Sequence, residues 1–329
     1  MDLALFGATA FAYRYYLSYN ALSYALLARQ DAATSNALIS HYQTNDSFRK
    51  LAEYEGKLTV QRDEQDDDKL AEGIAFAQKK GVIPIISPAP YVTIDVLGKS
   101  PSQVAQTILK KLDGATTGVL VLVGLSGTGK GTTVCRLREI LESEGRSVTT
   151  WSNGNVFRSV TLLAMTWCEQ NDKSVEEALT KENLASFMSM LTFGKFNGKF
   201  DTQIKGLGME HYVTEVSNTV LKTPIVSKNI PTVAGATQGE VILFAADAVT
   251  QMGKEGFVLL EGREQTVNYV ETPHRFKLVL SDDSLIGQRR AAQRIMGAAL
   301  CKVQEGDSSK AIQKAVDSVL KKMVNEIDS

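Results

Sequence analysis

From residue 118 onward, short unbroken apolar runs alternate with longer segments in which apolar residues recur every three or four positions. The apolar runs predict buried strands, and the periodic segments predict helices. Strands that alternate with helices indicate a parallel sheet with helices on both faces, which is an α/β fold. Strands are expected at 119–123, 147–151, 256–262 and 275–281, and helices at about 130–144 and 156–169, in a mostly helical middle part and in two final segments.

The first 115 residues have a different pattern. Residues 1–60 lack proline and are expected to be helical, and the acidic run "RDEQDDDK" at 62–69 is expected to be a solvated helix start or loop. A helix closed by Gly81 follows, then a proline-rich stretch, then a helix that Ser100 caps and Pro101 begins. We therefore expect a mostly helical N-terminal extension, 1–115, ahead of a domain spanning 116–329.

The stretch Phe11–Tyr24 is unusually rich in aromatic residues for a solvated tail. Arg14 interrupts it, so neither side offers the roughly 18 uncharged apolar residues of a membrane span. The favoured interpretation is a helix packed on the domain or on a protein partner bound through residues 1–60. An organelle-targeting or membrane-surface segment is the alternative.

Composition narrows the classes of partner and compartment. The formal net charge is −1, so no overall field favours nucleic acid or an anionic membrane. Three scattered cysteines without metal spacing suit a reducing compartment, with the cytoplasm favoured and a mitochondrion or plastid possible. The basic and aromatic residues of 193–206 are interpreted as a hairpin rather than as a base-stacking surface.

The clearest candidate for chemistry is the glycine-rich stretch "GLSGTGK" from Gly124 to Lys130, which fits the P-loop or Walker A pattern G-x-x-x-x-G-K. A predicted buried strand runs into it and a predicted helix leaves it. Backbone N–H groups in such a loop bind phosphate oxygens, and the lysine adds a positive charge. The expected ATP-binding residues are Gly124, Ser126, Gly127, Thr128, Gly129, Lys130, Gly131, Thr132 and Thr133.

The residue after Lys130 is a glycine rather than the usual serine or threonine, and the hydroxyl is displaced to Thr132. This G-x-G-K-G-T form resembles the nucleoside monophosphate kinases. Three later stretches extend the resemblance to the cytidylate kinases, in family order over about 118–321. They are "WSNGNVFRSVTLLAM", "LKTPIVSKNIPTVAG" and "VLLEGREQTVNYVETPHRFKLVLS", followed by the arginine-rich "LIGQRRAAQR".

The resemblance implies a P-loop kinase fold that transfers a phosphoryl group from Mg·ATP to a nucleoside monophosphate, with CMP or UMP favoured. Another small acceptor is the alternative substrate. It implies that the acceptor is bound by Ser152, Gly154, Arg158, Lys222 and Arg263. It implies that Thr132 and Glu261 organise Mg²⁺. Lys130 and Arg263, with Arg290 and Arg294 on one helical face, are the expected catalytic cations.

Several positions depart from the family. Its "DGRD" is "EGRE" here, its "IRT" arginine is Lys222, and the interval 295–316, where the family has a lid arginine motif, has no arginine. An arginine contributed to phosphoryl transfer can be worth roughly 10³–10⁵ in rate. A catalytically weak nucleotide-binding subunit of a larger assembly is therefore the alternative function.

Residues 91–112, "YVTIDVLGKSPSQVAQTILKKL", resemble the strand and helix that close the chain in small P-loop kinases. Here they precede the loop. Either a degenerate kinase domain precedes the complete one, or this strand and helix join the same sheet.

Overall fold

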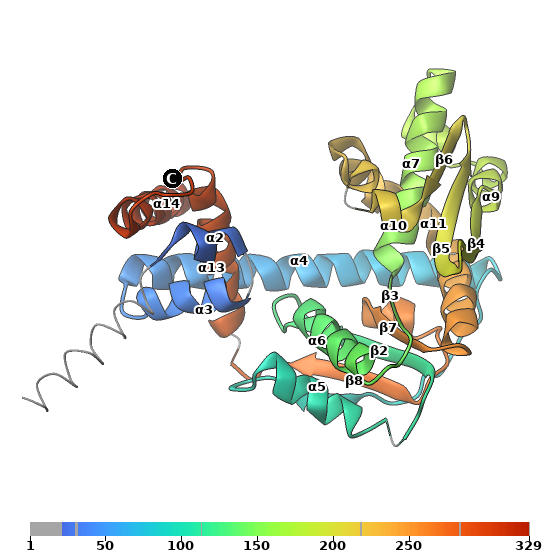
Figure 1. The fold of residues 1–329 in the computed structure, drawn as a ribbon. Coiled ribbons are helices and arrows are strands. Elements are labelled where there is room, and N and C mark those ends of the chain that lie inside the picture. Colours follow the sequence, from blue (N-terminus) through green and yellow to red (C-terminus); the bar gives the residue numbers. More distant parts are fainter. Residues whose placement is uncertain (1–21, 30–31, 113, 218, 283, 329) are drawn as a thin grey trace, which may run out of the picture. The chain divides into compact units, whose positions relative to one another are not determined.

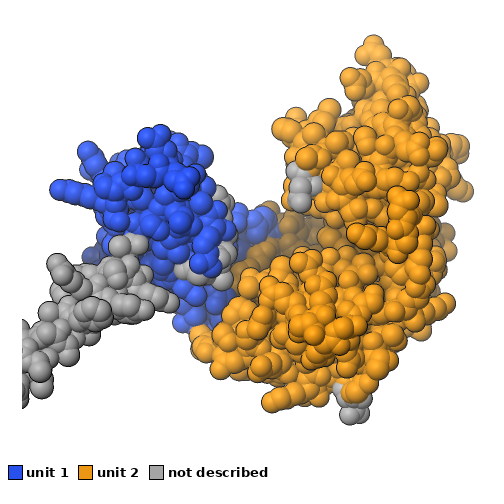
Figure 2. Space-filling model, viewed as in Figure 1, with its two compact units in different colours: residues 1–62, 280–329 blue, residues 63–279 orange. Residues whose placement is uncertain are grey.

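The structure is a computed structural model that describes residues 22–29, 32–112, 114–217, 219–282 and 284–328 (Figure 1). The chain divides into two compact units (Figure 2). One contains the residues up to 62 together with those from 280 onward, and the other contains residues 63–279. The boundary expected near residue 115 is therefore wrong, because it falls inside the second unit.

A five-stranded parallel sheet forms the centre of the second unit, in the order β1-β8-β2-β7-β3. Its strands are Val92–Asp95 (β1), Gly118–Gly124 (β2), Val148–Ser152 (β3), Phe257–Glu261 (β7) and His274–Val279 (β8). The central strand β2 is apolar on both faces and buried, as its sequence predicts. The expected α/β class with a parallel sheet is confirmed.

Helices cover both faces of this sheet. On one face, Val119, Val121 and Val123 share an apolar cluster with Val249 and Met252 of α11, which spans Pro224–Gly253. Side chains alternate along a strand, so Leu120 and Leu122 face the other side. Helix α6 (Lys130–Ser143) contacts β2, β3 and β7. Short α12 (Glu264–Val267) follows β7.

The edge strand β1 comes from the part of the chain that was expected to be an extension. Val92 pairs with Phe276 and Asp95 with Val279 in parallel register. The following helix α5 (Pro101–Leu109) has the expected Ser100 cap and buries Val104, Ala105 and Ile108. Its Ser102 hydroxyl accepts a 3.0 Å hydrogen bond from Arg136 of α6. The strand and helix thus join the same sheet and do not form a separate domain.

A second layer of structure is inserted between β3 and β7. It contains α7 (Asn153–Asn171), α8 (Val175–Ala178), α9 (Lys181–Ser189), α10 (Val213–Val216) and the 3₁₀ turn η1 (Val220–Lys222). An antiparallel sheet of β4 (Leu191–Phe196), β5 (Lys199–Gly206) and β6 (Met209–Tyr212) lies among them. Asn197 and Gly198 have positive φ and make the turn between β4 and β5, so the expected hairpin is confirmed.

The first unit is helical. It contains α2 (Tyr24–Arg29), α3 (Ala32–His41), α13 (Ser284–Leu300), α14 (Ser309–Asp328) and the first half of α4 (Asp46–Lys79). These helices share one apolar core, and the Tyr42 hydroxyl donates a 2.6 Å hydrogen bond to Asp317. The expected domain 116–329 included the C-terminal helices, but they belong to the helical unit and not to the unit that contains the sheet. The aromatic stretch up to residue 21 lies outside the described residues.

In the described part of the chain, every helix is too short or too polar to cross a membrane.

Candidate functional site

The glycine-rich loop connects the central strand β2 to α6. Gly124 has φ of 149°, and a Cβ there would lie 2.5 Å from the Leu278 carbonyl oxygen, so only glycine fits where β2 passes β8. Gly127 and Gly129 also have positive φ, and Gly129 is the residue that precedes α6. The loop thus turns tightly into the N-terminus of a helix that begins at Lys130.

Lys130 folds back over this loop. Its ammonium donates hydrogen bonds of 2.6 Å to the Gly124 carbonyl and 3.0 Å to the Leu125 carbonyl. Burial lowers the pKa of Lys130, whereas the charges of Glu261 and Asp63 act in the opposite direction. The cation is therefore held directly beside the loop.

Glu261 ends β7 next to the loop, where it pairs in register with Leu122 of β2. A Cβ at Gly131 would lie 3.8 Å from Glu261 Oε2, so this carboxylate faces the first turn of α6, where Thr132 follows. Among the described residues, no group of three or more His, Cys, Asp or Glu side chains could hold a metal ion alone. Carboxylate and hydroxyl oxygens fit Mg²⁺, which is usually held by one or two carboxylates together with substrate phosphates.

Ser152, Gly154 and Arg158 come together where β3 leads into α7. A Cβ at Gly154 would lie 3.1 Å from Arg158 Nη1 and 3.4 Å from Ser152 Oγ. Arg158 Nη1 also donates a 3.2 Å hydrogen bond to Asn155. Three of the expected acceptor-binding residues are thus neighbours.

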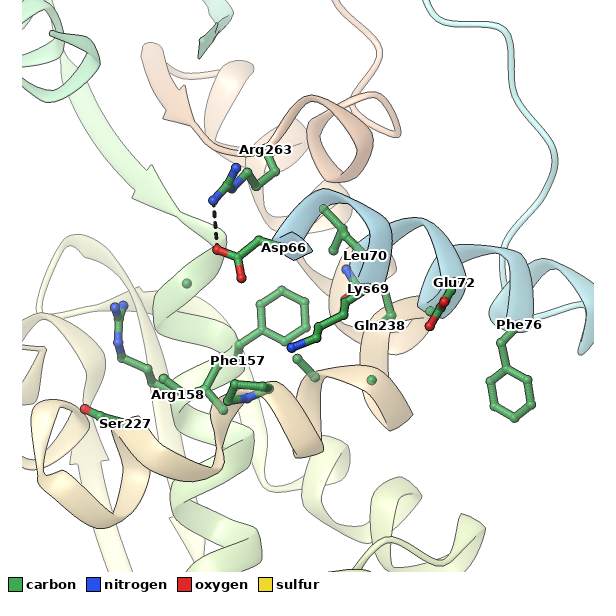
Figure 3. A pocket seen from close by; sticks show the side chains of 16 residues that line it. Asp66, Lys69, Leu70, Glu72, Phe76, Phe157, Arg158, Ser227, Gln238 and Arg263 are labelled. Carbon is green, nitrogen blue, oxygen red and sulfur yellow. Dashed lines mark hydrogen bonds and ion pairs between the residues drawn. The ribbon is translucent and has the colours of Figure 1, made fainter. Parts of the chain in front are cut away.

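Arg263 directly precedes α12, and its guanidinium contacts three carboxylates of α4. The ion-pair distances are 3.1 Å to Asp63, 3.0 Å to Asp66 and 3.3 Å to Asp67. Figure 3 shows the Asp66 side chain facing Arg263. The acidic run is therefore part of the site.

Asp63 also contacts the glycine-rich loop. Its carboxylate accepts hydrogen bonds of 2.8 Å from the Ser126 backbone N–H and 2.9 Å from the Ser126 hydroxyl. Asp63 is 2 % exposed. The expectation of a solvated helix start or loop is wrong at this residue, because the run lies in the middle of α4 with Asp63 turned toward the loop. Burial raises the pKa of Asp67, although Arg263 opposes this shift.

A sequence signal for this placement does exist. Leu70, Ile74 and Ala77 follow the i, i+4, i+7 spacing of a packed helix face. Continued one and two turns toward the N-terminus, the same face contains Asp66, Asp67 and Asp63. The many charged residues at 62–69 led to the expectation of a solvated segment, although the packed face of the helix continues through them.

Two cavities meet at Arg263. One, of about 300 Å³, is lined by the loop residues Gly124, Ser126 and Lys130 and by Ser152 and Glu261. The other, of about 610 Å³, lies between the second half of α4, the start of α7, and α11 (Figure 3). Both are lined by Leu70, Gly154, Phe157 and Arg263.

The remaining expected site residues lie elsewhere. Lys222 is exposed in η1 and lines neither cavity. Arg290 and Arg294 belong to α13 in the helical unit, where Arg294 forms an ion pair with the buried Glu55. Their expected catalytic role stays a prediction.

Comparison with protein-family models and with curated proteins finds no match for this chain.

Proposed function

We propose that this protein transfers a phosphoryl group from Mg·ATP to a nucleoside monophosphate, with CMP or UMP as the favoured class, or to another small acceptor. The observation that carries the proposal is the meeting of the two cavities at Arg263, Gly154 and Phe157. A phosphotransferase needs a donor and an acceptor bound side by side, with cations at the point of transfer.

The smaller cavity suits the donor phosphates. The loop amides and the N-terminus of α6 favour anions, and Lys130 supplies a charge at the same place. Glu261, with Thr132, would hold Mg²⁺ together with the phosphates. When bound, the ion neutralises the charge of the phosphates and orients them.

The larger cavity suits the acceptor. Arg158 and Arg263 line it and match the oxygens of a phosphate. Phe157 and Phe76 provide aromatic surface to the same cavity, which a planar base can contact. The protein needs no covalent nucleophile for this reaction, because positioning and charge stabilisation account for most of the catalysis.

A nucleotide-binding subunit without turnover is the second candidate. One observation favours it: two of the cations expected to act on the phosphates are bound to carboxylates. Arg263 contacts three aspartates, and Arg294 contacts Glu55. An enzyme of this kind requires Arg263 to exchange these partners for a substrate.

A coupled assay of ADP release, run with a panel of nucleoside monophosphates, separates the two candidates. If the protein is a kinase, ADP release should depend on one class of acceptor and should be lost in the variant Lys130→Ala. Binding of Mg·ATP without acceptor-dependent ADP release would support the non-catalytic subunit. Arg138→Ala, an exposed substitution further along α6, is the matched control and should behave like the unchanged chain.

A further inference from the structure

We propose that the acidic turn of α4, Asp63 to Asp67, is an internal competitor of the phosphate ligands. This inference rests on the proposed function and concerns the regulation of the same site. In the structure the turn is bound to the loop and to Arg263, and nucleotide and acceptor bind when it is released.

The groups that hold Asp63 are those that bind an oxyanion. A backbone N–H of the glycine-rich loop, a hydroxyl and a guanidinium all donate to one carboxylate, at 2.8, 2.9 and 3.1 Å. Phosphate oxygens use the same kinds of donor. Asp63 therefore takes up donors that a bound phosphate would need.

The turn acts on both cavities at once. Asp63 contacts Ser126, which lines the smaller cavity, whereas Asp66 lines the larger one. Leu70, one turn further along α4, lines both. Displacing a single helical turn would therefore free the donor side and the acceptor side together.

Charge makes the competition direct. Three carboxylates face one guanidinium, so the turn brings a net negative charge to the place where further anions would bind. Like charges at such distances disfavour binding. The acidic turn and a phosphate group would therefore compete for Arg263.

The ion pairs of Asp66 and Asp67 with Arg263 are weak enough to break and re-form. Their side chains are 51 % and 41 % exposed, and ion pairs of such exposure are weak because water and salt screen them. The next turns of α4 are fixed more firmly. A Cβ at Gly73 would lie 3.3 Å from Gln238 Cβ, and Ala77 belongs to an apolar cluster with Ile242 of α11.

The test is calorimetric titration of the full chain with Mg·ATP. The double variant Asp66→Asn/Asp67→Asn keeps the buried Asp63 and its hydrogen bonds, so its fold should be unaffected. If the closed state holds most molecules, the apparent dissociation constant is raised by the inverse of the open fraction. We expect the double variant to bind Mg·ATP about 3- to 10-fold more tightly, as exposed pairs of this strength allow.

Asp68→Asn is the matched control. It removes one charge from the same run, but Asp68 is exposed and no described contact joins it to Arg263. We expect its affinity to stay within twofold of the unchanged chain. Equal tightening by Asp68→Asn would show a general charge effect and overturn the proposal.

Other outcomes separate this proposal from the proposed function. Measurable and equal affinities in the unchanged chain and the double variant would overturn internal competition and leave nucleotide binding intact. Absence of binding in every variant would overturn the proposed function, and the competition with it. Asp63→Asn adds a second measurement: it should also tighten binding, whereas weaker binding in a folded variant would show that Asp63 supports the loop rather than competes for it.

Discussion

A chain that begins at Thr116 should not fold, because it lacks the edge strand and helix of the sheet. It loses the buried side chains Ile94, Val96, Val104, Ile108 and Leu112. At about 1.5–3 kcal/mol for each buried apolar side chain, their loss amounts to roughly 8–15 kcal/mol. The free energy of unfolding of a domain is about 5–15 kcal/mol, so the stabilisation lost with these side chains is as large as the total stability.

A polar contact increases this deficit. Arg275 is 1 % exposed, and its guanidinium bonds to the Tyr91 hydroxyl and to Asn268 Oδ1. Loss of Tyr91 leaves a buried donor without this partner, which costs about 1–3 kcal/mol more.

Circular dichroism and thermal melting test this expectation, with and without Mg·ATP. A chain that begins at Leu22 is the control and should melt cooperatively, because the described helices and the whole sheet remain. Ile108→Ala in the full chain gives a graded version, with an expected loss of about 2–5 kcal/mol. A Thr116 chain that melts cooperatively near the full-length temperature and binds Mg·ATP would refute the reasoning.

Three further predictions concern single side chains. Lys130→Ala should weaken Mg·ATP binding about 10- to 100-fold, because a charged hydrogen bond to phosphate is worth about 1.5–3 kcal/mol. The affinity is measured by calorimetry, and an unchanged value would contradict this prediction. Arg263→Ala should weaken acceptor binding at least tenfold more than Mg·ATP binding, as measured by separate titrations with CMP and ATP; equal losses would refute its assignment to the acceptor. Burial lowers the pKa of His274 below its ordinary 6.5, so the folded chain takes up a proton less readily than the unfolded chain. The free energy of unfolding should therefore fall as the pH drops below about 6.5. In urea unfolding at pH 5 and pH 7, His274→Gln should show a smaller fall than the unchanged chain. An equal fall in both chains would contradict this expectation.

Much of the sheet could be predicted from the sequence because its strands are continuous apolar runs. Val119–Val123 is buried on both faces, and a strand of this kind needs no knowledge of its partners to be recognised. The turn at Asn197 and Gly198 is similarly local, since both residues tolerate positive φ.

The features that the sequence left open or that were missed depend on distant contacts. Strand β1 is short and polar in part, and its place beside β8 joins residues more than 180 positions apart. Asp63 is buried, and Ser126 and Arg263, 63 and 200 residues further along the chain, lie against it. The periodicity of α4 places Asp63 on the packed face of the helix, but it does not say which distant residues that face contacts. The division of the chain at residues 62 and 280 likewise depends on helices from both ends packing together.

The site could be predicted around the glycine-rich loop and less well elsewhere. The glycine-rich loop is a local pattern, and Gly124, Ser126 and Lys130 do line one cavity. Ser152, Gly154 and Arg158 were expected from a resemblance and are neighbours in the structure. Lys222 was expected from the same resemblance and lines neither cavity, because η1 places it at an exposed position.

The most direct test of phosphoryl transfer is a ³¹P NMR spectrum of the full chain mixed with Mg·ATP and CMP. The proposed function predicts that resonances of CDP and ADP grow together while those of ATP and CMP decline, and that Lys130→Ala prevents this change. UMP in place of CMP tests the second favoured acceptor. A spectrum in which ATP gives only ADP and inorganic phosphate, or remains unchanged with either acceptor, would contradict the proposed function.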